Sequence, residues 1–164
     1  MKNYRIELKW TIAFAVMAIV WNLVERLAGL HTTNIALQQT VNGFILIPAA
    51  ALYVLALLDK KRNFYQGVMS YKQGLWSGFV LSVFVSAISP VYSLFNLQVV
   101  SPDFFDNLVA YNVQQGLMTQ AAAEQMFNLG NYITIGVIAG VITGTVMTAL
   151  IMIFVRSRKM LSAS

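Results

Sequence analysis

Three polar residues, Asn22, Glu25 and Arg26, lie close together near the end of an otherwise apolar run from Trp10 to Leu30. A charged side chain costs about 2.5 to 3.5 kcal/mol at the centre of a bilayer and less toward its surface, so such residues normally face protein or water. Glu25 lies roughly 22 Å along a helix that starts at Trp10. It is the one candidate acid or base within the apolar runs, but no helper group for catalysis can be identified beside it.

Glu25 and Arg26 are adjacent and point about 100° apart on a helix, so they do not neutralise each other along one face. We therefore expect cross-helix hydrogen bonds in a buried polar layer at the outer end of a bundle. Its other members are uncharged residues at the same level of the chain's apolar runs. The candidates, besides Glu25 and Arg26, are Asn22, Gln38, Gln39, Asn42, Tyr92, Ser93, Asn96, Asn131 and Thr134. The layer is either a structural network or a site for a solute or lipid headgroup, and the sequence leaves both interpretations open.

Other motifs that carry chemistry are missing from the sequence. The chain has no cysteine and one histidine, His31, which excludes thiolate ligands and leaves too few imidazoles for a zinc site. No phosphate-binding glycine loop and no serine in a nucleophile elbow occurs. We predict no catalytic residue, metal or cofactor, and we expect that the protein is not an enzyme.

The composition indicates a protein embedded in a bilayer, because 58% of the 164 residues are hydrophobic and 10% are charged. The predicted membrane spans are about residues 10–30, 41–58, 74–97 and 131–155. The last is an uncharged run of 25 residues; as a helix it reaches roughly 37 Å and crosses a hydrocarbon core of about 30 Å. Pro48 is expected to bend the second span. Residues 1–164 are treated as a single membrane domain.

Two of the predicted spans carry small residues at every fourth position, which places them on one helix face. Such stripes let membrane helices approach each other closely. We predict that the two stripes pack together within the chain, and packing against a second copy is the alternative. The stripes are Gly74, Gly78, Ser82 and Ser86 in the third span and Gly136, Gly140 and Gly144 in the fourth.

The segment from about 102 to 130 is too polar to cross a membrane. We expect Ser101 to cap a first short helix that ends at Gly116, and Thr119 to cap a second that ends near Gly130. Apolar residues recur on one side of each helix. The sequence therefore predicts an amphipathic helical hairpin that lies flat on the bundle or the membrane surface.

The basic residues are distributed asymmetrically about the predicted spans. Ten of the 11 fall on one side, and they are Lys2, Arg5, Lys9, Lys60, Lys61, Arg62, Lys72, Arg156, Arg158 and Lys159. Only Arg26 approaches the other side, which carries Asp103, Asp106 and Glu124. The positive-inside rule then predicts cytoplasmic termini and an extracytoplasmic hairpin. The net charge of +5 is read as this topology signal rather than as a surface for nucleic acid, although Lys60 to Arg62 also form a weak candidate patch for anionic headgroups.

Four segments resemble a bacterial family called domain of unknown function 4199. They are LLDKKRNFYQGVMSYKQG from Leu57 to Gly74, the pair Ser89 and Pro90, SPDFF from Ser101 to Phe105, and GLMTQAAAEQMFNL from Gly116 to Leu129. The resemblance covers nearly the whole chain. It departs at Met69 to Tyr71, which read MSY where related sequences have MTY. The family implies four spans, an inner-membrane location and a loose association with the cell envelope, with no assigned activity and no functional residues to transfer.

The predicted fold class is all-α, an integral membrane four-helix bundle with an extracytoplasmic amphipathic helical hairpin between spans three and four. The function we expect is that of a non-catalytic membrane subunit or scaffold acting through helix and hairpin contacts. The alternative is a carrier or binding protein for a small solute or lipid, with a polar cavity in the outer half of the bundle. The expected partners are the lipid bilayer and either a second copy of the chain or another membrane protein, with no nucleic acid.

Overall fold

The computed structural model describes residues 4–157, and every regular element within that range is helical. The elements are α1 (Arg5–Leu27), α2 (Ile35–Asn42), the 3-10 turn η1 (Gly43–Ile45), α3 (Leu46–Asn63), α4 (Tyr71–Phe95), the π-helical turn η2 (Asn96–Val100), α5 (Phe104–Gln114), α6 (Gln120–Met126) and α7 (Leu129–Val155). Lys2, Arg158 and Lys159, three of the basic residues used for the topology prediction, lie outside the described residues.

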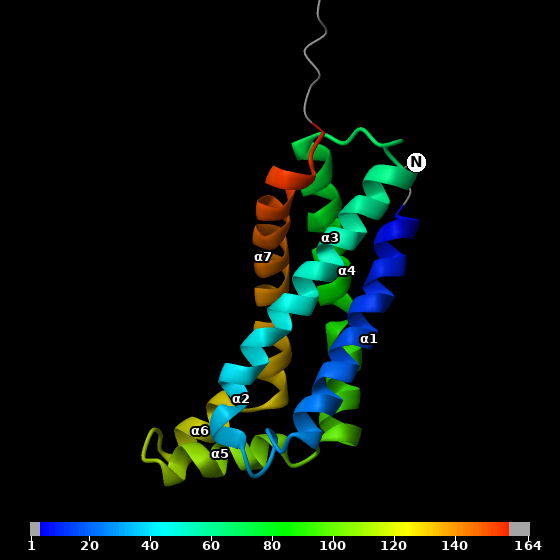
Figure 1. Cartoon of the computed structure of the whole chain (residues 1–164). Helices are drawn as coiled ribbons and strands as arrows, with labels where there is room; N and C mark the ends of the chain where they lie inside the picture. The colour runs from blue at the N-terminus through cyan, green and yellow to red at the C-terminus, as the bar shows by residue number, and fades with distance from the viewer. Residues whose placement is uncertain (1–3, 158–164) are drawn as a thin grey trace, which may run out of the picture.

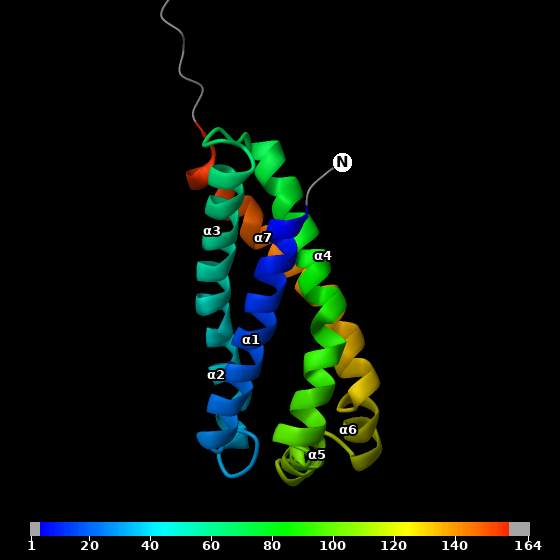
Figure 2. The ribbon, with the colours of Figure 1, turned by 90° about the vertical axis from the view of Figure 1, so that its right-hand side faces the viewer.

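Four helical stretches are long and apolar enough to cross a membrane: Arg5–Leu27, Ile35–Asn63, Tyr71–Val100 and Leu129–Val155. They form the elongated bundle of Figure 1, in which α1 and α7 lie on opposite sides of α3 and α4. The α3–α4 loop and both ends of the described chain lie at one end of the bundle, here called the terminal end. The short helices α5 and α6 lie at the other, the hairpin end (Figure 2). The predicted all-helical membrane bundle is confirmed.

The second membrane helix is longer than the predicted span of 41–58, because it runs from Ile35 to Asn63. Its last turn contains Lys60, Lys61 and Arg62, which favour a helix C-terminus through the helix dipole. Near Pro48, where a bend is expected, the chain forms the 3-10 turn η1 directly before α3. A proline supplies no N–H to the helical ladder, so the chain winds differently just ahead of it.

The hairpin has the predicted break and one of its two predicted caps. Gly116 adopts a positive φ of 66°, a conformation open to glycine, and the Thr119 side chain accepts from the Ala122 N–H at 3.4 Å. The prediction for Ser101 is wrong, since Asp103 occupies the N-cap position of α5 and makes no side-chain cap bond. The Ser101 hydroxyl is used elsewhere, as described below.

Small residues form the seam between α4 and α7. A Cβ atom added at Gly74 would collide with Met152, and one added at Gly144 would collide with Tyr53 and Ser82. At Gly140 the added atom would lie 2.6 Å from Ser86 Oγ. The two stripes thus face each other within the chain, as helix packing through small residues requires. Gly136 is an exception to the prediction, because a Cβ there would meet no atom within 4 Å.

Replacement of Gly78 by leucine is expected to destabilise the bundle. An added Cβ at Gly78 would lie 2.7 Å from Thr148 Cβ, so a leucine must push α7 away, and overpacking of this kind costs about 1 to 3 kcal/mol. The measurement is thermal unfolding in detergent, followed by circular dichroism. Gly136→Leu is the control, because Gly136 belongs to the predicted stripe but has open space at its Cβ. Equal melting temperatures for the two variants would show that the seam is not closely packed.

Candidate functional site

A chain of buried polar side chains at the hairpin end joins α1 to the hairpin. His31 lies at its centre, with Nδ1 2.6 Å from Ser101 Oγ and Nε2 3.3 Å from Glu25 Oε2. The indole N–H of Trp21 donates to Glu25 Oε1 at 2.9 Å. Asn107 donates from Nδ2 to the His31 carbonyl at 2.9 Å. These five residues are called the hairpin latch.

The local fold of the α1–α2 connection places His31 in the latch. Gly29 has a φ of 73°, and the Leu30 N–H donates to the Glu25 carbonyl at 2.9 Å, so the chain turns back beside the last turn of α1. The His31 ring then packs on Phe104, with ring centroids 4.8 Å apart. The ring and the backbone carbonyl of His31 therefore both contact the segment that begins the hairpin.

Serine, histidine and a carboxylate in one hydrogen-bonded chain are the groups of a nucleophilic triad. A carboxylate only accepts hydrogen bonds, so with Glu25 ionised the His31 Nε2–H donates to it and the Ser101 hydroxyl donates to Nδ1. A nucleophile also needs room for a substrate beside it. Glu25 and Ser101 are each 2% exposed and His31 is 3% exposed, which leaves no such room. The geometry therefore supports a structural latch.

The predicted polar layer is only partly assembled. Glu25 is buried and hydrogen-bonded as expected, but its partners are Trp21 and His31 rather than residues of spans two to four. Asn22 donates to the Ala18 carbonyl within α1, and Asn131 is exposed and donates to the Gln125 carbonyl. The remaining candidates divide by burial: Asn96 is buried, Gln38, Asn42, Tyr92 and Ser93 are half-buried, and Gln39 and Thr134 are exposed. The turn at Gly29 brings His31 to Glu25 in place of the predicted partners.

Arg26 does not make the predicted cross-helix bonds through its buried nitrogen. Arg26 Nη1 and Asn96 Oδ1 are both buried and have no hydrogen-bond partner among the described residues. A donor and an acceptor are therefore left unsatisfied at the hairpin end, where burial of such groups is costly.

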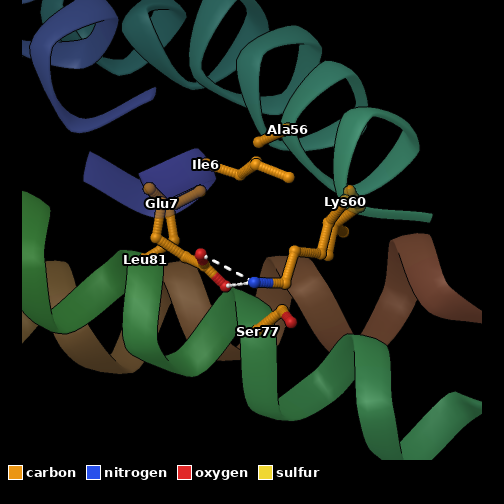
Figure 3. Close-up of a pocket in the computed structure, with 7 residues that line it drawn as sticks. Ile6, Glu7, Ala56, Lys60, Ser77 and Leu81 are labelled. Atoms are coloured by element: carbon orange, nitrogen blue, oxygen red, sulfur yellow. Dashed lines mark hydrogen bonds and ion pairs between the residues drawn. The ribbon is translucent and has the colours of Figure 1, made fainter. Parts of the chain in front are cut away.

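A second buried polar cluster, which the sequence analysis missed, lies at the terminal end. Glu7 of α1 pairs with Lys60 of α3 at 2.9 Å, and each residue is 4% exposed. Figure 3 shows the carboxylate directed at the ammonium group, with Ser77 of α4 beside them. The adjoining cavity is about 10 Å³ in volume, close to the minimum for one water molecule. Glu7 is the one acid among the basic residues before the first predicted span. Its position among basic residues is the sequence feature that could have indicated an ion pair here.

The last turns of α3, which carry Asp59 and the basic residues, bond to two other helices. Asp59 accepts from Lys9 Nζ at 2.6 Å and from Trp10 Nε1 at 2.8 Å. Lys61 Nζ donates to the Val155 carbonyl of α7 at 2.8 Å. Since Lys60 is buried against Glu7, two of the three lysine and arginine side chains proposed as a headgroup patch are already bonded within the protein.

The fold and its two buried clusters define an all-helical membrane protein whose two buried acids, Glu7 and Glu25, pair with Lys60 and His31. The model of a family described as "Protein of unknown function (DUF4199)" matches residues 9–157. The chain belongs to this family, as its sequence motifs suggested. Comparison with curated proteins and with solved structures gave no match.

Loss of the Ser101 hydroxyl is expected to loosen the hairpin. Ser101→Ala would leave His31 Nδ1 buried without a partner, at a cost of about 1 to 3 kcal/mol. Amide hydrogen exchange in α5 should accelerate, and the melting temperature should fall. Ser89→Ala is the control, because the Ser89 hydroxyl bonds within its own helix, to the Ser86 carbonyl and the Tyr92 side chain. If α5 exchanges alike in both variants, Ser101 does not hold the hairpin.

Proposed function

We propose that this chain is a non-catalytic membrane subunit or scaffold that acts through the surfaces of its helices and hairpin. The observation that carries the proposal is the hairpin latch, in which the acid, the histidine and the serine are bonded to one another and buried. A solute carrier of the alternative kind would need an open polar cavity around Glu25. At 2% exposure Glu25 is instead enclosed by side chains, which favours the scaffold.

The exposed side of the hairpin is the surface that we assign to a protein partner. Leu117 is 65% exposed and Met126 is 52% exposed, although both lie in the part of the chain too polar to enter a bilayer. The same segment carries Asp103, Asp106 and Glu124 as exposed acids. Exposed apolar side chains among charged ones are typical of protein interfaces.

The proposal includes an orientation in the bacterial inner membrane. Among the described residues the terminal end carries Arg5, Lys9, Lys60, Lys61, Arg62, Lys72 and Arg156. Arg26 is the one described basic residue toward the hairpin end. The positive-inside rule then favours a cytoplasmic terminal end and a hairpin on the outer side.

A single cysteine introduced in place of Leu117 tests both parts of the proposal, because the natural chain has no cysteine. In intact cells Leu117→Cys should react with a membrane-impermeant maleimide, whereas Lys72→Cys at the terminal end should react only after lysis. A photoreactive maleimide on the same Leu117→Cys variant should then form one discrete protein adduct in membranes. The matched control is Ile138→Cys, whose side chain is exposed within α7 and should meet lipid.

Two results would contradict the proposal. Labelling of Lys72→Cys from outside intact cells would show that the orientation is the opposite one. Equal protein adducts from positions 117 and 138 would show that the hairpin surface is not a specific binding site for a protein partner. A fluorophosphonate probe that modifies Ser101 in the purified protein would show an activated nucleophile, and with it an enzyme.

A further inference from the structure

An open groove of about 530 Å³ runs along α1 beside Pro48 of α3. Its lining is made almost wholly of apolar side chains: Ala13, Val16, Met17, Val20, Trp21, Val24 and Pro48. From Ala13 to Val24 the groove covers roughly 16 Å of helix. This length is close to the hydrocarbon depth of one leaflet, about half of 30 Å.

A lysine stands at the terminal end of this groove. Lys9 lies four residues before Ala13, so it shares the groove's face of α1 at a distance of one helical turn. Its side chain is 66% exposed, and its Nζ lies 2.6 Å from Asp59. An ammonium group has three donors, and the exposed side chain can turn others toward the headgroup region while its stem lies on apolar surface.

We propose that the groove holds one acyl chain of an anionic phospholipid whose phosphate lies on Lys9. The groove is an apolar surface about as long as one leaflet is deep, which suits an acyl chain. Lys9 provides a positive charge one helical turn beyond the groove, which suits the phosphate of the headgroup. A helix from a second copy fits less well. Membrane helices approach each other through small residues, whereas this face of α1 presents Val16, Val20 and Val24 at 52 to 55% exposure.

Trp21 connects the lipid site to the hairpin latch. Its indole lines the groove, while its N–H donates to Glu25 at 2.9 Å. An acyl chain in the groove packs against the same ring that holds the Glu25 carboxylate. The site does not depend on the scaffold role proposed above, since it uses a different surface of the bundle.

The experiment measures quenching of Trp21 fluorescence by brominated lipids. Trp10→Phe and Trp76→Phe together leave Trp21 as the single tryptophan, because the chain has three. The protein is placed in vesicles of mixed phosphatidylglycerol and phosphatidylcholine, with bromine near the chain terminus of one lipid or the other. Brominated phosphatidylglycerol should quench Trp21 with a roughly threefold higher apparent affinity than brominated phosphatidylcholine. This preference is somewhat smaller than the full effect of one free lysine near an anionic surface, because Lys9 also pairs with Asp59.

Two matched pairs of substitutions locate the effect. Lys9→Gln should abolish the preference for phosphatidylglycerol, while Lys72→Gln, an exposed lysine at the same end, should keep it. Ala13→Phe should fill the groove and reduce quenching by both lipids. Ala139→Phe, on an exposed position of α7, should leave quenching unchanged.

The proposal is overturned if both lipids quench Trp21 equally in the parent protein, since the groove is then ordinary lipid-facing surface. It is also overturned if the brominated lipids quench Trp21 as strongly in Ala13→Phe as in the parent protein. Protection of Trp21 from both brominated lipids, together with a cross-linked dimer, would assign the groove to a second copy of the chain. Circular dichroism of each variant establishes that the helices are intact.

Discussion

A polar side chain carried by a membrane helix needs a partner inside the protein, and this requirement governs both ends of the bundle. Water is not present in the hydrocarbon to satisfy it, so an unpaired group is costly. At the hairpin end Glu25 is satisfied by Trp21 and His31. At the terminal end Glu7 is satisfied by Lys60. Each pairing joins two segments that the apolar surfaces alone would not fix relative to each other.

The small-residue seam has a different role from these polar contacts. Apolar helices gain little from association in lipid, because lipid tails are as apolar as leucine. Close approach at Gly78 and Thr148 brings α4 and α7 into dense packing instead. The seam thus holds the centre of the bundle, and the buried polar pairs fix its ends. Bonds from the last turns of α3 to α1 and α7 add to the contacts at the terminal end. The exposed groove on α1 meets these contacts at Trp21, whose indole lines it and donates to Glu25.

The features that could be predicted from the sequence are those set by local patterns of residues. The glycine and serine stripes repeat every four residues, so a helix places them on one face whatever its partner is, and only Gly136 departs from that expectation. The break at Gly116 and the cap at Thr119 are equally local. The latch is different, because His31 and Ser101 are 70 residues apart and neither belongs to a repeating pattern. Glu7 and Lys60 are 53 residues apart. The apolar periodicity of α1 does not indicate that Glu7 pairs with Lys60.

Ser101 shows how a local pattern can mislead. Serine followed by proline and an acid is a strong helix start, but the same hydroxyl has a better partner in the His31 ring at 2.6 Å. Buried imidazole nitrogen needs that bond more than an exposed helix end needs a cap, since water can satisfy the latter. Glu25 has partners other than those predicted for a related reason, because the turn at Gly29 places His31 beside it and helix geometry alone does not reveal that turn.

The central claim is that His31 joins α1 to the hairpin through two buried hydrogen bonds. His31 is the single histidine of the chain, so ¹⁵N-histidine labelling gives one ring to observe by nuclear magnetic resonance. At neutral pH the account predicts a slowly exchanging proton on Nε2, an unprotonated Nδ1, and a change in the Nδ1 shift on Ser101→Ala. A ring proton that exchanges rapidly with water, in a spectrum unaltered by Ser101→Ala, would contradict it.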